Sequence, residues 1–188
     1  SDLSWQVAKQ PILRGISFDI QPGAFVGLLG PNGSGKSSLL RCLYRYTVPT
    51  GGKIQFCHQD ISYINNNEYA KQVAVVLQHT PQQFHLSVYD VICLGLIPHT
   101  PWFIPSSNQQ KNLVETALEQ VGLADKRQQD FELLSGGEKQ RAMIARAIVQ
   151  QPKLLIMDEP TSHLDVKYQI QIMELAKSLG VTVLASFH

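Results

Sequence analysis

One stretch of the sequence combines glycines, a lysine and a serine in the order that binding of a phosphate chain requires. Residues 30–37 read GPNGSGKS and fit the pattern G-x-x-x-x-G-K-[ST]. An apolar segment, residues 24–29, precedes them, and a helical pattern follows. Backbone N–H groups of such a loop curl around phosphate oxygens, and the helix N-terminus adds positive potential. The motif therefore predicts a phosphate site between a strand and a helix.

The side chains of this loop have separate expected roles. Lys36 is expected to reach the β- and γ-phosphates of ATP, and the Ser37 hydroxyl to ligate Mg²⁺. ATP and Mg²⁺ are thus the predicted cofactors. The further residues expected to contact the nucleotide are Asn32, Gly33, Ser34, Gly35 and Ser38.

Two carboxylates close an apolar segment later in the chain, where residues 154–159 read LLIMDE. Ligands collect at the carboxyl ends of parallel strands, so these acids are expected near the phosphate loop. Asp158 is then placed to hold Mg²⁺ through water, and Glu159 to polarise an attacking water as a general base. Alone, the pair could be two solvated acids at a strand end; the phosphate loop upstream favours the functional interpretation.

A third stretch, residues 134–141, reads LSGGEKQR and opens a helical pattern. Ser135 with Glu138 fits a capping box, an interpretation that needs no ligand. The alternative is that Ser135, Gly136 and Gly137 form a second helix N-terminus that binds phosphate. Because the first loop already supplies one such N-terminus, the second would suit the γ-phosphate of another molecule's ATP.

An alternation of strands and helices must position these residues. Such alternation implies an α/β fold with a mostly parallel sheet. Strands are expected at residues 16–20, 24–29, 53–61, 73–78, 154–158 and 181–187, and helices at residues 37–46, 87–96, 111–123, 136–151 and 166–180. We expect one domain over residues 1–188, with a catalytic core of 1–81 and 143–188 and a helical subdomain of 82–142.

Composition excludes several classes of protein. A net charge of +1 gives no basic field for nucleic acid, so no nucleic-acid partner is expected. The three cysteines are scattered and indicate a reducing compartment rather than a disulfide framework. The sequence contains neither an apolar run long enough to span a bilayer nor a signal peptide pattern, which predicts a cytoplasmic location.

The three motifs together resemble those of the ATP-binding cassette (ABC) proteins. Their signature motif is LSGG[QE], present here as LSGGE, and residues 157–165, MDEPTSHLD, complete the pattern. The resemblance covers essentially the whole chain. It implies a RecA-like P-loop NTPase core with an N-terminal antiparallel β part and an inserted α-helical subdomain. Family members continue for several tens of residues past this sequence, so we expect its C-terminus to be truncated.

The resemblance assigns roles to further residues. Gln78 matches the Q-loop glutamine, which touches Mg²⁺ or the attacking water. Asp165 closes a segment that looks like the D-loop, where His163 stands at a position that is more often small. His188 matches the switch histidine that contacts the γ-phosphate. Trp5 occupies the place of the aromatic residue that stacks on adenine, with a core tryptophan as the alternative. The expected catalytic residues are Lys36, Gln78, Glu159 and His188.

The resemblance also implies partners. ATP would lie between the phosphate loop of one subunit and residues 135–137 of a second, in a head-to-tail homodimer that ATP closes and hydrolysis reopens. The loop after Gln78 would couple this motion to transmembrane permease subunits, which places the chain peripherally on the inner face of the cell membrane. A periplasmic or lipoprotein substrate-binding protein would be an indirect partner.

Residues 87–103 resemble a pattern of ATPases for iron–siderophore, haem and cobalamin uptake, V-x-D-V-V-x-x-G-R-x-P-H. The matching residues are Val88, Asp90, Val91, Gly95, Pro98 and His99, whereas Leu96 replaces the usual arginine. The segment before the signature lacks the exporter pattern, which favours an importer. The alternatives are a soluble ABC ATPase in nucleic-acid repair or translation, and an inactive truncated cassette.

Overall fold

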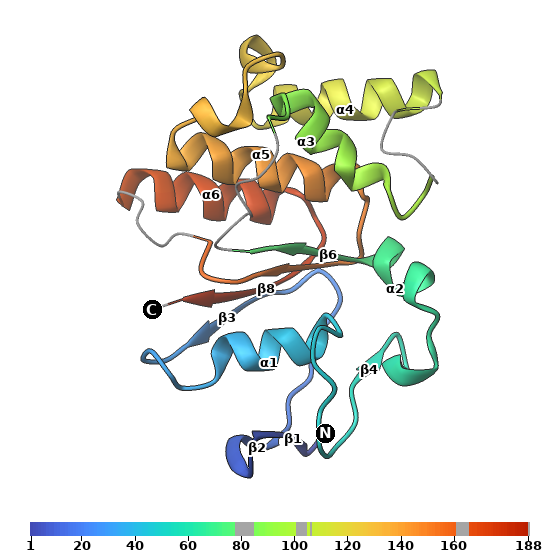
Figure 1. The fold of residues 1–188 in the computed structure, drawn as a ribbon, viewed down its shortest axis with the longest axis vertical. Coiled ribbons are helices and arrows are strands. Elements are labelled where there is room, and N and C mark those ends of the chain that lie inside the picture. The colour runs from blue at the N-terminus through green and yellow to red at the C-terminus, as the bar shows by residue number, and fades with distance from the viewer. Residues whose placement is uncertain (78–84, 101–104, 106, 161–165, 188) are drawn as a thin grey trace.

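A four-stranded parallel sheet forms the centre of the computed structural model, which describes residues 1–77, 85–100, 105, 107–160 and 166–187. The strand order is β3–β8–β7–β6 (Figure 1). The bounds are Phe25–Leu29 for β3, Val73–Val76 for β6, Leu154–Met157 for β7 and Thr182–Phe187 for β8. Each pair is parallel, and a parallel pair needs a long crossover connection. The expected parallel sheet is confirmed.

Helices cover both faces of this sheet (Figure 1). On one face lie α3 (Val88–Cys93), α4 (Asn108–Gln120), α5 (Gly136–Val149) and α6 (Val166–Ser178). On the other lies α1 (Lys36–Leu43), with α2 (Asn66–Gln72) just before β6. Short 3₁₀ helices are η1 (Ile61–Tyr63), η2 (Leu94–Leu96), η3 (Ala124–Lys126) and η4 (Phe131–Leu133).

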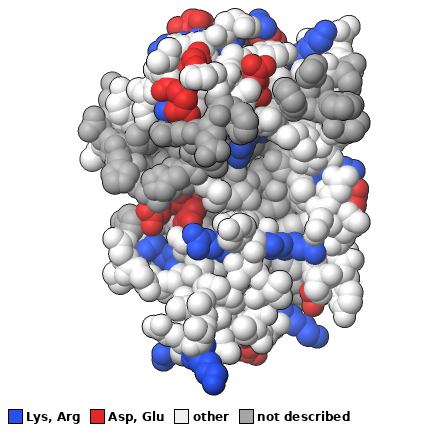
Figure 2. Space-filling view, in the orientation of Figure 1, with Lys and Arg blue, Asp and Glu red and all other residues white. Residues whose placement is uncertain are grey.

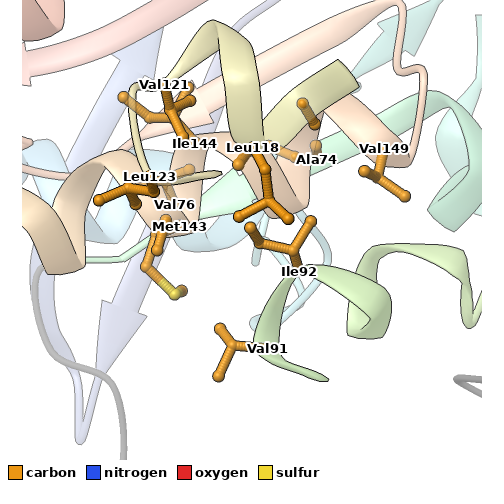
Figure 3. Packing of buried hydrophobic residues seen from close by; sticks show 14 of the residues in the cluster. Ala74, Val76, Val91, Ile92, Leu118, Val121, Leu123, Met143, Ile144 and Val149 are labelled. Carbon is orange, nitrogen blue, oxygen red and sulfur yellow. The ribbon is translucent and has the colours of Figure 1, made fainter. Parts of the chain in front are cut away.

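The larger hydrophobic core lies between the sheet and the helices α3 to α6. Figure 3 shows Val76 of β6 packed with Ile92 of α3, Leu118 of α4 and Ile144 of α5, and all four side chains are fully buried. Burying a side chain of this size stabilises the fold by about 1.5–3 kcal/mol. A smaller cluster, which includes Leu40 of α1, fills the opposite face. The two cores hold the helices in fixed positions on the sheet.

The N-terminal residues form an antiparallel hairpin of β1 (Leu3–Val7) and β2 (Gln10–Ile16). The expected antiparallel part is therefore present, but the strand predicted over residues 16–20 is wrong. Ile16 already ends the ladder opposite Leu3, and Phe18 beyond it is 42% exposed. The alternation at 16–20 therefore does not mark a strand with a buried face.

The strand expected at residues 53–61 is instead a small hairpin of β4 (Gln55–Phe56) and β5 (Gln59–Asp60). Its turn consists of Cys57 and His58, both with positive φ, at 50° and 65°. The backbone reverses there, so the segment cannot continue as one strand.

Between β6 and β7, the described residues form helices and turns without a named strand. The boundary expected at residues 142 and 143 falls inside α5. The division into a core and a helical subdomain stays an expectation. In the described part of the chain, no helix is both long enough and apolar enough to span a bilayer.

Candidate nucleotide-binding site

The phosphate loop lies where the sequence predicts it, between the end of β3 at Leu29 and the start of α1 at Lys36. Gly35 caps α1 with φ of 95°, a conformation that strains a residue with a side chain. A Cβ atom on Gly30 would lie 2.9 Å from Ser34 Oγ. The glycines therefore permit a tight loop that ends at a helix N-terminus, the geometry that suits an anion.

Lys36 folds back over this loop. Its Nζ atom donates hydrogen bonds to Gly30 O at 2.6 Å and Pro31 O at 3.0 Å. The ammonium group is thus held at the loop by two carbonyl oxygens, which phosphate oxygens can replace as charged acceptors. The other loop residues lie around it. Asn32, Gly33 and Ser34 are exposed, and Gly35 and Ser38 are half-buried.

The two halves of the expected metal site meet. Ser37 Oγ donates a hydrogen bond of 3.0 Å to Asp158 Oδ1, although 121 residues separate them. A hydroxyl and a carboxylate are oxygen ligands of the kind that Mg²⁺ takes, directly or through the waters that it keeps, so this pair fits the ion. Figure 2 shows acidic and basic side chains together on the left, the side where β8 ends in Figure 1.

Ser186 joins this cluster, and sequence analysis did not find it. The residue is fully buried in β8, donates to Asp158 Oδ1 at 2.7 Å and accepts from Glu159 N at 2.9 Å. Glu159 has φ of 50°, which is unfavourable for a residue with a side chain. The bond to Ser186 holds this strained backbone in place, directly after the carboxylate that faces Ser37.

The segment at Ser135 forms the capping box that the sequence predicts. Ser135 Oγ accepts from Glu138 N at 3.4 Å, and Glu138 Oε2 accepts from Ser135 N at 2.9 Å. Lys126 forms an ion pair with the other carboxylate oxygen of Glu138. The hydrogen bonds from Lys126 and from Ser135 lower the pKa of Glu138 to about 2. The helix start is therefore well ordered without any ligand.

The two helix N-termini are not on the same face of the sheet. The helix α1 covers one face and α5 the other (Figure 1). Gly136 is exposed beside Ser135, while Gly137 is buried. A Cβ atom on Gly137 would lie 3.5 Å from the ring of Tyr168 in α6. The start of α5 is thus an exposed backbone surface separate from the phosphate loop.

Trp5 lies in the N-terminal hairpin, opposite a residue that packs on the phosphate loop. It pairs with Leu13 across the N-terminal hairpin, and Leu13 Cδ2 lies 3.1 Å from where a Cβ atom on Gly35 would be. Its half-buried side chain packs against the cluster that contains Leu39 of α1. Both stacking on adenine and a core role therefore stay open. Three predicted site residues lie outside the described residues: Gln78, Asp165 and His188.

A family model described as "ABC transporter" matches residues 13–162, which include the phosphate loop, the segment at Ser135 and the two acids. The chain belongs to the ABC transporter family. As a member of this family it is an ATPase, and its parallel sheet with helices on both faces is the P-loop NTPase fold of the family's cassettes.

Several curated relatives are similar to this family member over nearly its whole length. An uncharacterised ABC transporter ATP-binding protein of Methanocaldococcus jannaschii is 36% identical over 96% of this chain and 71% of its own. The hemin import ATP-binding protein of Bradyrhizobium diazoefficiens is 35% identical over 99% and 71%. The ferric enterobactin transport ATP-binding protein of Escherichia coli is 31% identical over 96% and 68%. Some relatives are longer than these three. The chain spans only 44% of a cobalamin import ATP-binding protein of Halobacterium salinarum.

Solved structures of ATP-binding cassettes superpose on the whole of this chain. The cbiO1 protein of Clostridium perfringens, part of the ABC transporter complex cbiONQ, superposes with a TM-score of 0.86 and 30% identity. The match covers 100% of this chain and 76% of that one. An ATP-binding cassette in its ADP conformation gives a TM-score of 0.89 at 25% identity, over 100% and 79% of the two chains.

Proposed function

We propose that this chain is the ATP-hydrolysing subunit of an ABC importer, which works as a head-to-tail dimer on transmembrane permease subunits. The observation that carries the proposal is the meeting of Ser37 and Asp158 at 3.0 Å beside Lys36. Two segments distant in sequence, the phosphate loop with the start of α1 and the residues after β7, thereby place a cation, a hydroxyl and a carboxylate at one edge of the sheet. This set of groups suits a nucleoside triphosphate with its bound metal ion.

Each of these groups has a task in hydrolysis. The loop backbone and the N-terminus of α1 bind the phosphates, and Lys36 exchanges its carbonyl partners for phosphate oxygens. Ser37 and Asp158 would hold Mg²⁺, which supplies neutralisation of phosphate charge. Glu159 accepts a proton from the attacking water as general base, with its backbone held by Ser186. Gln78 and His188 are proposed to complete the site.

The second helix N-terminus supports the dimer. Residues 135–137 begin α5 on the face of the sheet opposite α1, so they do not share a face with the phosphate loop of the same chain. In the proposed dimer this exposed start binds the γ-phosphate of ATP held by the other subunit. ATP then stabilises only the closed dimer, and hydrolysis releases it.

The proposed class of transported substrate is supported by the names of the relatives and by the sequence motif at residues 87–103. Relatives named for hemin, ferric enterobactin and cobalamin import match this chain at 31–35% identity. Two matching residues of the motif at 87–103 also contact α5. Gly95 fits closely against Arg146 O of α5, and His99 Nε2 lies 2.8 Å from Gln150 O at the end of that helix. We infer that ATP hydrolysis by this chain drives uptake of an iron–siderophore, haem or cobalamin. Attachment to the permease holds the chain at the inner face of the cell membrane.

Sedimentation of the Glu159→Gln protein tests this function. Loss of the general base should slow hydrolysis and trap the closed dimer, so Mg²⁺-ATP should convert monomers into dimers. The control is Ser135→Arg in the same background, whose side chain fills the start of α5 and should abolish the dimer without affecting ATP binding. A protein that binds ATP and stays monomeric at all concentrations would refute the proposed dimer.

A further inference from the structure

Two acidic side chains flank the serine that the proposed function assigns to the partner's ATP. Glu132 precedes Ser135 by three residues, and Glu138 follows it by three. Each carboxylate has its own lysine. Lys139 Nζ lies 2.8 Å from Glu132 Oε2, and Lys126 Nζ forms an ion pair with Glu138 Oε1. The negative charge around this helix start is therefore offset by two cations.

Glu138 is the acid that contacts Ser135. Its Oε2 atom accepts hydrogen bonds from Ser135 N at 2.9 Å and from Ser135 Oγ at 2.8 Å. The hydroxyl has a single proton, which it gives here to the carboxylate. A phosphate oxygen must compete with Glu138 for that proton, and an unpaired carboxylate would also repel the phosphate. The hydrogen bonds of Glu138 thus order the start of α5, but its negative charge disfavours an anion there.

Lys126 offsets the negative charge of Glu138 without competing with Ser135. It reaches Glu138 from η3 and binds Oε1, which leaves Oε2 for Ser135. The side chains of Lys126 and Glu138 are 33% and 18% exposed, so salt screens this pair less than a fully exposed one. The ion pair can therefore cancel the charge of Glu138 without breaking the cap.

We propose that Lys126 is a positioning residue of the signature segment, which neutralises Glu138 so that the N-terminus of α5 can bind the γ-phosphate of the partner's ATP. The inference rests on the proposed function, because it requires that Ser135 meet a nucleotide held by a second subunit. The inference predicts that Lys126 is needed only because residue 138 carries a negative charge. If residue 138 were a neutral amide, the same helix start would not need the lysine.

A double-mutant cycle in the Glu159→Gln background tests this prediction. Sedimentation with Mg²⁺-ATP would measure dimer dissociation for the background, Lys126→Gln, Glu138→Gln and the double variant. We expect Lys126→Gln to weaken the dimer about tenfold, because the unpaired Glu138 of each subunit then repels the γ-phosphate held by the other. Binding of a fluorescent ATP analogue to monomers should stay unchanged. The double variant should dimerise as tightly as Glu138→Gln, and Lys126→Arg should restore the dimer.

The matched control is Lys139→Gln, because its partner Glu132 makes no hydrogen bond to Ser135 in the described part of the chain. Its dimer should stay within about twofold of the background. A Lys126→Gln dimer as tight as the background, or a double variant as weak as Lys126→Gln, overturns the inference. If Lys126→Gln fails to fold, a weakened dimer of Glu138→Gln overturns it. A background protein that binds ATP but never dimerises overturns the proposed function and this inference together.

Discussion

Asp158 Oδ1 accepts hydrogen bonds from two serines at opposite ends of the chain, Ser37 at 3.0 Å and Ser186 at 2.7 Å. The phosphate-loop motif predicts the first. The second has no sequence signature, since a single serine in an apolar strand commonly has no special role. Met157 of β7 pairs with Ala185 of β8, so the next residues in this register are Asp158 and Ser186. Finding Ser186 thus requires the strand order.

Replacing Ser186 should therefore impair the chemistry more than the binding of ATP. Ser186→Ala removes the hydroxyl that donates to Asp158 and accepts from Glu159 N, and a hydrogen bond to a charged group contributes about 1.5–3 kcal/mol. We expect kcat for ATP hydrolysis to fall about tenfold or more, with KM nearly unchanged. Steady-state ATPase assays measure both constants.

The matched variant is Ser186→Thr, which keeps the hydroxyl and should retain most of the activity. A wild-type kcat for Ser186→Ala would contradict the positioning role. Equal losses for the alanine and threonine variants would also contradict it, because they would point to packing alone.

Elements with one clear periodicity were predictable, whereas elements fixed by tertiary contacts were not. The sheet strands β6, β7 and β8 are short apolar runs, and α5 starts with a capping box. In contrast, α2 buries only Tyr69 and so has no apolar stripe. The turn of the N-terminal hairpin has positive φ at Ala8 and Lys9, without the glycine or asparagine that usually marks such a turn.

The contact between η2 and α5 gives a prediction at the scale of elements. A Cβ atom on Gly95 would lie 2.1 Å from the carbonyl oxygen of Arg146, a backbone atom that cannot move aside. Gly95→Ala should therefore destabilise the fold by about 1–3 kcal/mol, the cost of overpacking. Urea denaturation measures the change.

Gly51→Ala is the control for this experiment. Its added Cβ would lie 3.7 Å from Ser4 Cβ, an ordinary contact. Its free energy of unfolding should change by about 1 kcal/mol or less. Equal stability of the Gly95→Ala protein and the parent would show that η2 and α5 are not packed as described.

The fold as a whole presents two helix starts on opposite faces of one sheet, and the proposed function assigns a phosphate to each. The phosphate loop before α1 contains Lys36 and lies beside Asp158, while Ser135 at the start of α5 is hydrogen-bonded to its capping residue Glu138. Within one chain the second start has no phosphate to bind in the proposed function. The proposed mechanism therefore requires two copies of the chain, each completing the other's site.

Mixing two inactive variants tests this requirement most directly. Lys36→Ala removes the phosphate-loop cation, and Ser135→Arg blocks the start of α5. In a head-to-tail dimer, a mixed pair keeps one site with an intact loop from one subunit and an intact Ser135 from the other. Each mixed dimer has one complete site of two, so an equimolar mixture should recover activity up to about half of the parent's, whereas either variant alone has no complete site. No recovery at any mixing ratio, with both variants folded, would contradict the shared site.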